Sequence, residues 1–306
     1  MKTDRPLFLN EQQVREHLRM AELIPAMEKA LIDFSAGKVT QPVRSVIKVD
    51  GAAATGFLGL MPALTPDGLG LKAVTFYPSN AERGIHTHMA TIFLVDPETG
   101  TPLAVMDGRL ITEMRTAAVS AVATKLLAPP EAKVLAILGS GVQARSHVEA
   151  LRLVRQFKDI RVWSPTPEHA EGFAKEIGGT AMCAEEAVRG ADVVVTATSS
   201  TTPILRGAWL KPGRHVNAVG ACRPDWRELD DEAMSNVVFV DSREGAKQES
   251  GDIILSSAKI YAELGEALAG KIPSRANETT IFKSLGMAVE DIAAAMLVYR
   301  RARSKD

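Results

Sequence analysis

A glycine-rich segment, Gly139-Ser-Gly-Val-Gln-Ala144, is the clearest chemical motif in this sequence. It follows the apolar run 134–138 and opens a stretch of helical composition, which is the context that a dinucleotide-binding fingerprint requires. The first glycine would permit the tight turn, the second would let the backbone approach a pyrophosphate, and helix N-terminal amides would hold the phosphates. A tight strand-to-helix turn without a ligand is the alternative. The residues predicted to bind the cofactor are Gly139, Ser140, Gly141, Val142 and Gln143.

The end of the second predicted strand bears on which dinucleotide binds. NAD-binding proteins usually place an acidic residue there, on the ribose hydroxyl. This strand instead ends Val162-Trp-Ser-Pro-Thr166, so no acid repels a 2′-phosphate, and Ser164 and Thr166 are suited to donate hydrogen bonds to one. Arg145 lies close by in sequence, although the Arg usually expected at the strand end is absent. We predict NADPH as the cofactor, with NADH as the alternative.

Three cations in the N-terminal half are candidates for binding an anionic substrate: Arg44, Lys72 and Arg115. Arginine binds a carboxylate with a bidentate fork, and a carboxylate held in this way would orient an amino or imino acid. Residue type alone is weak support, because most Lys and Arg side chains are solvated surface residues.

Other potential sites have simpler explanations. His86 and His88 would lie on one face of a strand, but no third metal ligand is evident, so we predict no metal. Cys222 has no partnering histidine, which favours a small pocket-lining residue over a nucleophile. The basic cluster 299–305 fits a solvated helix end.

Composition limits the classes of protein and partner. The 306 residues suggest two domains, and 46% hydrophobic with 24% charged residues is typical of a folded globular chain. With 36 Lys and Arg against 37 Asp and Glu, the chain has no positive excess for nucleic acid. The apolar runs are only as long as strands, which predicts no membrane helix. Polar residues begin again at Asn10, before an apolar stretch long enough for a signal peptide, so secretion is not indicated. Two distant cysteines fit a reducing cytoplasm.

The N-terminal half is predicted to be α+β. A helix is expected from an N-cap at Asn10 to near Gly37. Another, 111–127, contains the predicted domain boundary. Strands of a mixed or antiparallel sheet are expected over 45–49, 56–61, 71–77, 91–95 and 102–106, the last two joined by a turn at 96–100.

From Lys133 onward, strands alternate with helices, as in a parallel α/β sheet. The fold class is therefore α/β, a Rossmann-type parallel-sheet domain plus an α+β domain. The last segment, from Ser284 to Arg303, is predicted to be helical. Strands are expected over 134–138, 160–163, 192–196, 215–219 and 237–240.

Several segments together resemble the ornithine cyclodeaminase and mu-crystallin family, and the mu-crystallin branch most. They include Lys72-Ala-Val-Thr-Phe-Tyr77, Arg115-Thr-Ala-Ala-Val-Ser120 and Glu249-Ser-Gly-Asp252, with further segments at 41–44, 58–62, 105–108, 139–144, 218–230 and 282–291. The resemblance implies a homodimer. It also implies that residues 1–115 with 286–306 form a substrate-binding and dimerisation domain, and that 116–285 form the NAD(P)-binding domain.

The resemblance implies roles for individual residues. Positions matching Arg44, Lys72 and Arg115 bind the substrate carboxylate in the family, so these three are predicted to act in substrate binding and catalysis. Further cofactor contacts are implied for Thr91, Thr116, Ala197, Thr198, Val219, Ser284 and Leu285.

Two departures separate the branches. Where cyclodeaminases have a catalytic Asp, this chain has Cys222, which cannot act as a carboxylate, and the Glu before their Met-Pro is also missing from 58–62. Both losses argue against ornithine cyclisation, and the first argues against alanine deamination. Asp225, three residues further on, is a candidate to supply or relay a proton; a capped turn is the alternative.

The predicted function is therefore NAD(P)H-dependent reduction of cyclic ketimines. Pyrroline-2-carboxylate and piperideine-2-carboxylate would give proline and pipecolate by hydride transfer to the C=N carbon. The alternatives are amino-acid deamination, as in ornithine cyclodeaminase or alanine dehydrogenase, and a non-catalytic NADP(H)-binding protein.

Overall fold

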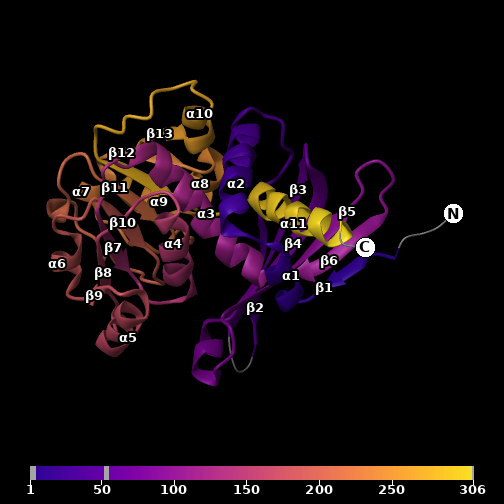
Figure 1. The fold of residues 1–306 in the computed structure, drawn as a ribbon, viewed down its shortest axis with the longest axis horizontal. Coiled ribbons are helices and arrows are strands. Elements are labelled where there is room, and N and C mark those ends of the chain that lie inside the picture. Colours follow the sequence, from indigo (N-terminus) through magenta and orange to yellow (C-terminus); the bar gives the residue numbers. More distant parts are fainter. Residues whose placement is uncertain (1–4, 52–54, 305–306) are drawn as a thin grey trace. The chain divides into compact units, whose positions relative to one another are not determined.

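The computed structural model describes residues 5–51 and 55–304, which divide into two compact units (Figure 1). Unit 1 comprises Met1–Arg115 and Met287–Asp306, and unit 2 comprises Thr116–Gly286. The first division falls inside helix α3 (Arg109–Leu127), so one helix contributes to both units. Gly286, expected with the C-terminal helix, belongs to unit 2.

Unit 1 is built on a six-stranded sheet in the order β1-β6-β5-β4-β3-β2. All neighbouring strands are antiparallel except β1 and β6, which are parallel. Its strands are β1 (Leu7–Leu9), β2 (Ser45–Asp50), β3 (Thr55–Thr65), β4 (Gly68–Phe76), β5 (His88–Val95) and β6 (Pro102–Asp107), with a short 3₁₀ helix η1 (Pro78–Arg83) before β5. The short first strand was not predicted.

The helices of unit 1 are α1 (Glu11–His17), α2 (Met20–Ser35) and α11 (Ala288–Arg303). Asn10 caps α1 as expected, and its side chain accepts a hydrogen bond from the Gln13 amide. The single helix predicted to reach Gly37 is wrong, because Leu18 and Arg19 adopt extended backbone angles and divide it in two. Leu18 is buried at this break.

Helix α11 lies beside α2 and packs on β3 and β4 (Figure 1). Alternate residues of a strand point to the same face, so Gly70 and Lys72 of β4 share one. Gly70 lets the helix approach closely, since a Cβ there would be 2.6 Å from Ile292 Cδ1. Lys72 meets the first turn of the same helix through Asp291. The packing of α11 therefore decides what surrounds Lys72.

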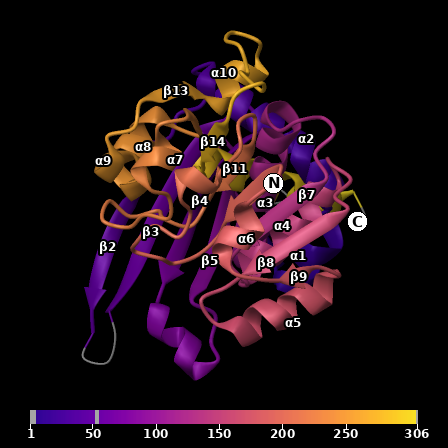
Figure 2. The ribbon, with the colours of Figure 1, turned by 90° about the vertical axis from the view of Figure 1, so that its left-hand side faces the viewer.

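Unit 2 is an eight-stranded parallel sheet with helices between its strands (Figure 2). The order is β13-β12-β14-β11-β10-β7-β8-β9. The strands are β7 (Val134–Leu138), β8 (Asp159–Trp163), β9 (Thr180–Ala181), β10 (Val193–Thr196), β11 (His215–Ala218), β12 (Val237–Val240), β13 (Ile260–Glu263) and β14 (Thr280–Lys283).

The helices of unit 2 complete this α/β arrangement. They are α4 (Val142–Arg152), α5 (Pro167–Ile177), α6 (Ala184–Val188), α7 (Asp231–Met234), α8 (Arg243–Glu249), α9 (Gly251–Ser256) and α10 (Leu264–Leu268), with a short 3₁₀ helix η2 (Gly207–Trp209). The run β9-β8-β7-β10-β11-β14 is the strand order of a Rossmann dinucleotide-binding domain, and β12 and β13 extend it. Strands β9, β13 and β14 were not predicted.

Candidate functional site

The glycine loop has the geometry expected of a dinucleotide-binding turn. Gly139 follows β7 with φ of 134°, a backbone conformation that favours glycine. A Cβ at this position would also lie 2.5 Å from the carbonyl oxygen of Ala197, which follows β10. In the sheet of unit 2, the order in which the chain adds strands reverses between the neighbours β7 and β10. The glycine loop follows β7 and so lies at this switch point, where sheets of this kind bind nucleotides.

The start of α4 fits a pyrophosphate. Gly141 is the N-cap and offers no side chain to the first amides of the helix, which a phosphate would satisfy. A Cβ built on Gly141 meets no atom of the described residues within 4 Å. The glycine therefore keeps open the space that a dinucleotide pyrophosphate needs. Val142 and Gln143 begin the helix as predicted.

A cavity of about 400 Å³ adjoins the loop on the side of β8 and α5. Its lining includes Ser140, Arg145 and His169. The Ser140 hydroxyl donates to the Ser164 hydroxyl at 2.9 Å, at the end of β8. The Arg145 guanidinium donates to the Ser140 carbonyl at 2.5 Å and contacts Glu176 at 2.9 Å. Thr166 is exposed at the N-cap of α5. The cavity thus has one hydroxyl, that of Ser140, and the Arg145 guanidinium in its lining, and Ser164 lies beside it through its hydrogen bond with Ser140.

The predicted cofactor contacts on the other half of the sheet follow three neighbouring strands. Ala197 and Thr198 follow β10, Val219 follows β11, and Ser284 and Leu285 follow β14. Since the carboxyl ends of parallel strands share one edge of a sheet, these residues gather at one edge. Of the remaining two, Thr116 lies in α3, and Thr91 lies exposed in β5 of unit 1.

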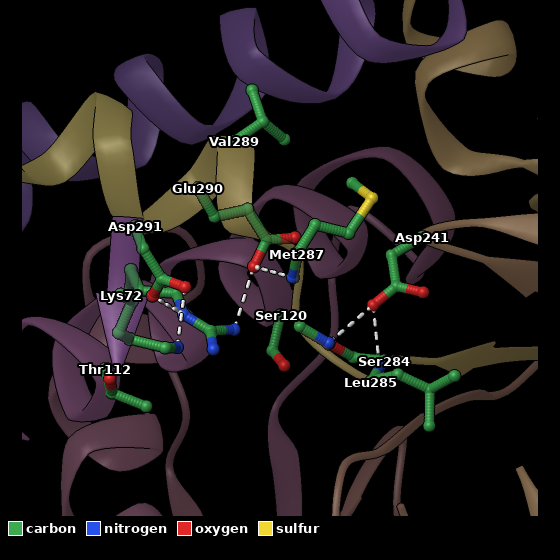
Figure 3. Close-up of polar contacts among 12 residues, drawn as sticks. Lys72, Thr112, Ser120, Asp241, Ser284, Leu285, Met287, Val289, Glu290 and Asp291 are labelled. Carbon is green, nitrogen blue, oxygen red and sulfur yellow. Dashed lines mark hydrogen bonds and ion pairs between the residues drawn. The ribbon is translucent and has the colours of Figure 1, made fainter. Parts of the chain in front are cut away.

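The junction between β14 and α11 is held by Asp241 in unit 2. Its Oδ2 accepts hydrogen bonds from the amides of Leu285 at 2.6 Å and Gly286 at 2.7 Å (Figure 3). The helix predicted from Ser284 therefore begins only at Ala288, because these amides bond to a side chain instead of opening a helix.

Lys72 and Arg115 both contact Asp291 in the first turn of α11, and Figure 3 shows Lys72 beside Asp291. Lys72 Nζ lies 2.6 Å from Asp291 Oδ2, and Arg115 Nε donates to Asp291 Oδ1 at 2.9 Å. Arg115 Nη1 donates to Glu290 Oε2 at 2.8 Å. The Lys72 side chain is only 1% exposed and that of Arg115 4%. One carboxylate thus joins two predicted substrate-binding cations.

Burial perturbs the charges of this cluster. Burial lowers the pKa of Lys72 to about 8, opposed by Asp291 and reinforced by the nearby cations Arg115 and Arg44. The two cations lower the pKa of Asp291 although its burial opposes them. Arg44, just before β2, is thus close enough to influence Lys72. A substrate carboxylate would add the negative charge that these cations favour.

Glu290 and Asp291 are site residues that sequence reasoning missed. Acidic residues in the first turn of a helix commonly complement the helix dipole. That common role gave no reason to expect that these two also bind buried cations. The segment 282–291 carries the two acids directly after the apolar residues Met287, Ala288 and Val289, but this pattern alone does not indicate a site. Gln41 also contributes, since its Oε1 accepts from the Val289 amide at 2.8 Å and holds the start of α11.

The other predicted or weighed residues lie elsewhere. Asp225 is exposed in a turn closed by a hydrogen bond from the Trp226 amide to the Arg223 carbonyl. Cys222 is exposed and is a free cysteine. His88 stacks on Phe76 with ring centroids 4.3 Å apart. Within 5–51 and 55–304, no group of three His, Cys, Asp or Glu side chains is placed to hold a metal, and no helix is long and apolar enough to cross a membrane.

These features define a two-unit protein of the Rossmann class, with a dinucleotide loop in one unit and a buried cation cluster in the other. The chain belongs to the ornithine cyclodeaminase/mu-crystallin family, whose model matches residues 4–306.

Three similar proteins illustrate the range of the family. The ketimine reductase mu-crystallin of Mus musculus is 54% identical over 304 residues, which cover 96% of each chain. The structure of Thermococcus litoralis Δ1-pyrroline-2-carboxylate reductase with NADH and L-proline is 37% identical, with a TM-score of 0.92 and 98% of each chain covered. An archaeal alanine dehydrogenase dimer with bound NAD is 35% identical, with a TM-score of 0.92, covering 98% of this chain and 97% of that one.

Proposed function

We propose that this protein is an NAD(P)H-dependent reductase of cyclic ketimine carboxylates. The observation that carries the proposal is the meeting of Lys72 and Arg115 on Asp291, a buried pair of cations suited to a substrate carboxylate. The glycine loop at the switch point of the Rossmann sheet supports the cofactor. The similarity to a ketimine reductase and a pyrroline-2-carboxylate reductase supports the imine as substrate.

The side chains of unit 1 would bind and orient the substrate. The Lys72 ammonium has three N–H donors and its contact with Asp291 uses one, so others are suited to a carboxylate oxygen. Asp291 and Glu290 hold Arg115 through two different nitrogens, which fixes the plane of its guanidinium. Arg44 would add a third positive charge. A carboxylate held at this cluster keeps the imine carbon in one orientation.

The backbone of unit 2 would bind the cofactor. Amides of the Gly139–Gln143 segment are proposed to hold the pyrophosphate, and the residues that follow β10, β11 and β14 the nicotinamide half. When bound, the reduced nicotinamide supplies the hydride to the C=N carbon, and the imine nitrogen takes up one proton. That Asp225 supplies or relays this proton stays a prediction.

NADPH is the proposed preferred form of the cofactor. Ser164 is nine-tenths buried at the end of β8, and its hydroxyl meets that of Ser140 beside the cavity. Arg145 lines the same cavity, while its contact with Glu176 offsets part of its charge. A 2′-phosphate would compete with Glu176 for this guanidinium. Titrating NADPH and NADH separately would test the preference.

We also propose that the protein is a homodimer. Strand β2 is an edge strand, and all six of its residues are exposed. Val46 is 54% and Ile47 53% exposed, although neighbouring residues of a strand point to opposite faces. Both faces of this apolar edge are thus uncovered, as expected of an interface. Light scattering of wild type and V46E would test this, and a wild-type monomer would contradict it.

The test of the activity follows the loss of reduced cofactor with pyrroline-2-carboxylate and piperideine-2-carboxylate. Ornithine with NAD and alanine with NAD are the parallel reactions. Rapid cofactor oxidation with the imines, forming proline or pipecolate, is the expected result. Ammonia release from ornithine or alanine with inert imines would instead make the protein a deaminase despite Cys222. Cofactor binding without any turnover would make it a non-catalytic binding protein.

A further inference from the structure

Three fully buried charged residues lie at the strand edge of unit 2 where the nicotinamide half of a cofactor is expected. They are Glu228, Asp252 and Lys283, and each has 0% exposure. Lys283 is the last residue of β14, and Asp252 lies in the first turn of α9. The proposed reaction uses none of them. Because burying a charge is costly unless it is paired, their contacts call for an explanation.

Glu228 connects the ends of two adjacent strands. Its Oε1 accepts hydrogen bonds from the amide and the hydroxyl of Thr198, both at 2.7 Å, after β10. Its Oε2 accepts from the Thr196 hydroxyl at 2.7 Å and from the Gly220 amide at 2.9 Å, after β11. Four donors on one carboxylate favour its ionised form. The carboxylate thus fixes both loops that carry predicted nicotinamide contacts.

Asp252 and Lys283 extend this network to a third strand. Asp252 Oδ1 accepts from the amides of Glu228 at 2.8 Å and Leu229 at 3.0 Å. Its Oδ2 lies 3.0 Å from Lys283 Nζ. Two carboxylates and one ammonium leave a net charge of minus one when all three are ionised. Cys222 also interacts electrostatically with Lys283.

The ionisation of the cluster follows from its burial and its charges. Burial acts to lower the pKa of Lys283, but Asp252 and Glu228 together raise it, so this side chain stays charged. Burial also raises the pKa of Glu228, against the influence of Lys283. Because the pKa of Glu228 is raised, the test is made at alkaline pH, where this carboxylate is most fully ionised.

We propose that Glu228 is a positioning residue for the nicotinamide half of the cofactor, and that the Glu228–Asp252–Lys283 cluster favours the oxidised over the reduced form. Oxidised nicotinamide carries one positive charge more than the reduced ring. A net negative cluster at this edge lowers the free energy of that cation and so assists hydride donation. The inference rests on cofactor binding in the proposed function and not on the imine.

The test compares the dissociation constants of NADP⁺ and NADPH without substrate, at about pH 8. E228Q removes one charge and keeps an amide oxygen as acceptor. D252N removes the same charge from another position and leaves Oδ1 to accept from the Glu228 amide. We expect the ratio Kd(NADP⁺)/Kd(NADPH) to rise about fivefold or more in both variants, as a nearby unit charge predicts.

The matched control is D192N. Asp192 accepts from the amides of Lys133 and Val134 at the opposite, amino-terminal end of the same sheet. This variant should keep the wild-type ratio. Circular dichroism and thermal unfolding establish whether each variant folds. If E228Q does not fold, the ratio measured for D252N tests the charge effect alone. A wild-type ratio in folded D252N overturns the charge effect, and wild-type affinities for both cofactor forms in folded E228Q overturn the positioning role. Because no imine is present, inactivity toward ketimines leaves this result unaffected.

Discussion

Lys72 should lose its affinity for carboxylates within an accessible pH range. Its pKa of about 8 lies below the ordinary value of 10.5, chiefly because the side chain is buried. One pH unit above 8, only about a tenth of the ammonium remains protonated. If the charged form binds the substrate carboxylate, binding should weaken about tenfold for each further pH unit.

The assay uses a competitive inhibitor whose ring nitrogen does not titrate in this range, such as pyrrole-2-carboxylate. Its inhibition constant should be constant near neutral pH and rise above about pH 8. The variant K72M should bind it roughly 10- to 150-fold more weakly at neutral pH, the loss expected for a charge-assisted hydrogen bond. That variant should also lack the rise at alkaline pH. K38M, which alters an exposed lysine of unit 1 outside the proposed dimer edge, is the control and should behave as wild type.

Unfolding does not explain such a loss of binding. The folded pKa of Lys72 is lower than the unfolded one, so the unfolded chain binds more protons between about pH 8 and 10.5. The contribution of this group to stability therefore increases with pH in that window while binding declines. An inhibition constant that stays flat to pH 10 in wild type, or an alkaline rise that persists in folded K72M, would refute the role of Lys72.

Three further substitutions test other parts of the structure. G139A should weaken cofactor binding and lower the melting temperature, since a Cβ with φ of 134° would lie 2.5 Å from the Ala197 carbonyl oxygen; unchanged binding in a titration would contradict this. R145A should raise the KM for NADPH about tenfold and leave that for NADH within about twofold, measured by steady-state kinetics. R155A should destabilise unit 2 by about 2 kcal/mol in urea unfolding, because this guanidinium donates to four carbonyls at and after the end of α3. R152A, in an exposed residue nearby, should have a smaller effect.

Elements with strong local signals were predictable. The alternation of apolar strands with helices predicted the Rossmann sheet, and the turn at 96–100 joins β5 and β6 as expected. Strand β14 was missed because it is short and ends in Lys283, whose charge suggests an exposed segment. The break between α1 and α2 was missed because Leu18 continues the apolar spacing of a single helix.

Residues of the candidate site were predictable to different degrees. The glycine loop is a local motif, so its turn and its helix followed from the order of residues alone. The candidate substrate cations were chosen from a family resemblance, and nothing in the sequence indicated which carboxylates they meet. Arg115 of α3 and Asp291 of α11 are 176 positions apart, so no local pattern in the sequence indicates their hydrogen bond.

Buried charge is the part of the site that sequence patterns represent least well. Lys72, Glu228 and Lys283 look like solvated residues, because most charged side chains are exposed. Each is buried beside a partner from a distant segment of the chain. Lys72 meets Asp291, Glu228 meets hydrogen-bond donors after β10 and β11, and Lys283 meets Asp252. Such a partner gives no periodic signal in the sequence. Removing it lowers the stability of the fold by about 3–5 kcal/mol when a buried charge is left without a partner. Charged residues within otherwise apolar strands, as at Lys72 and Lys283, are thus the positions where a sequence pattern indicates a buried charge.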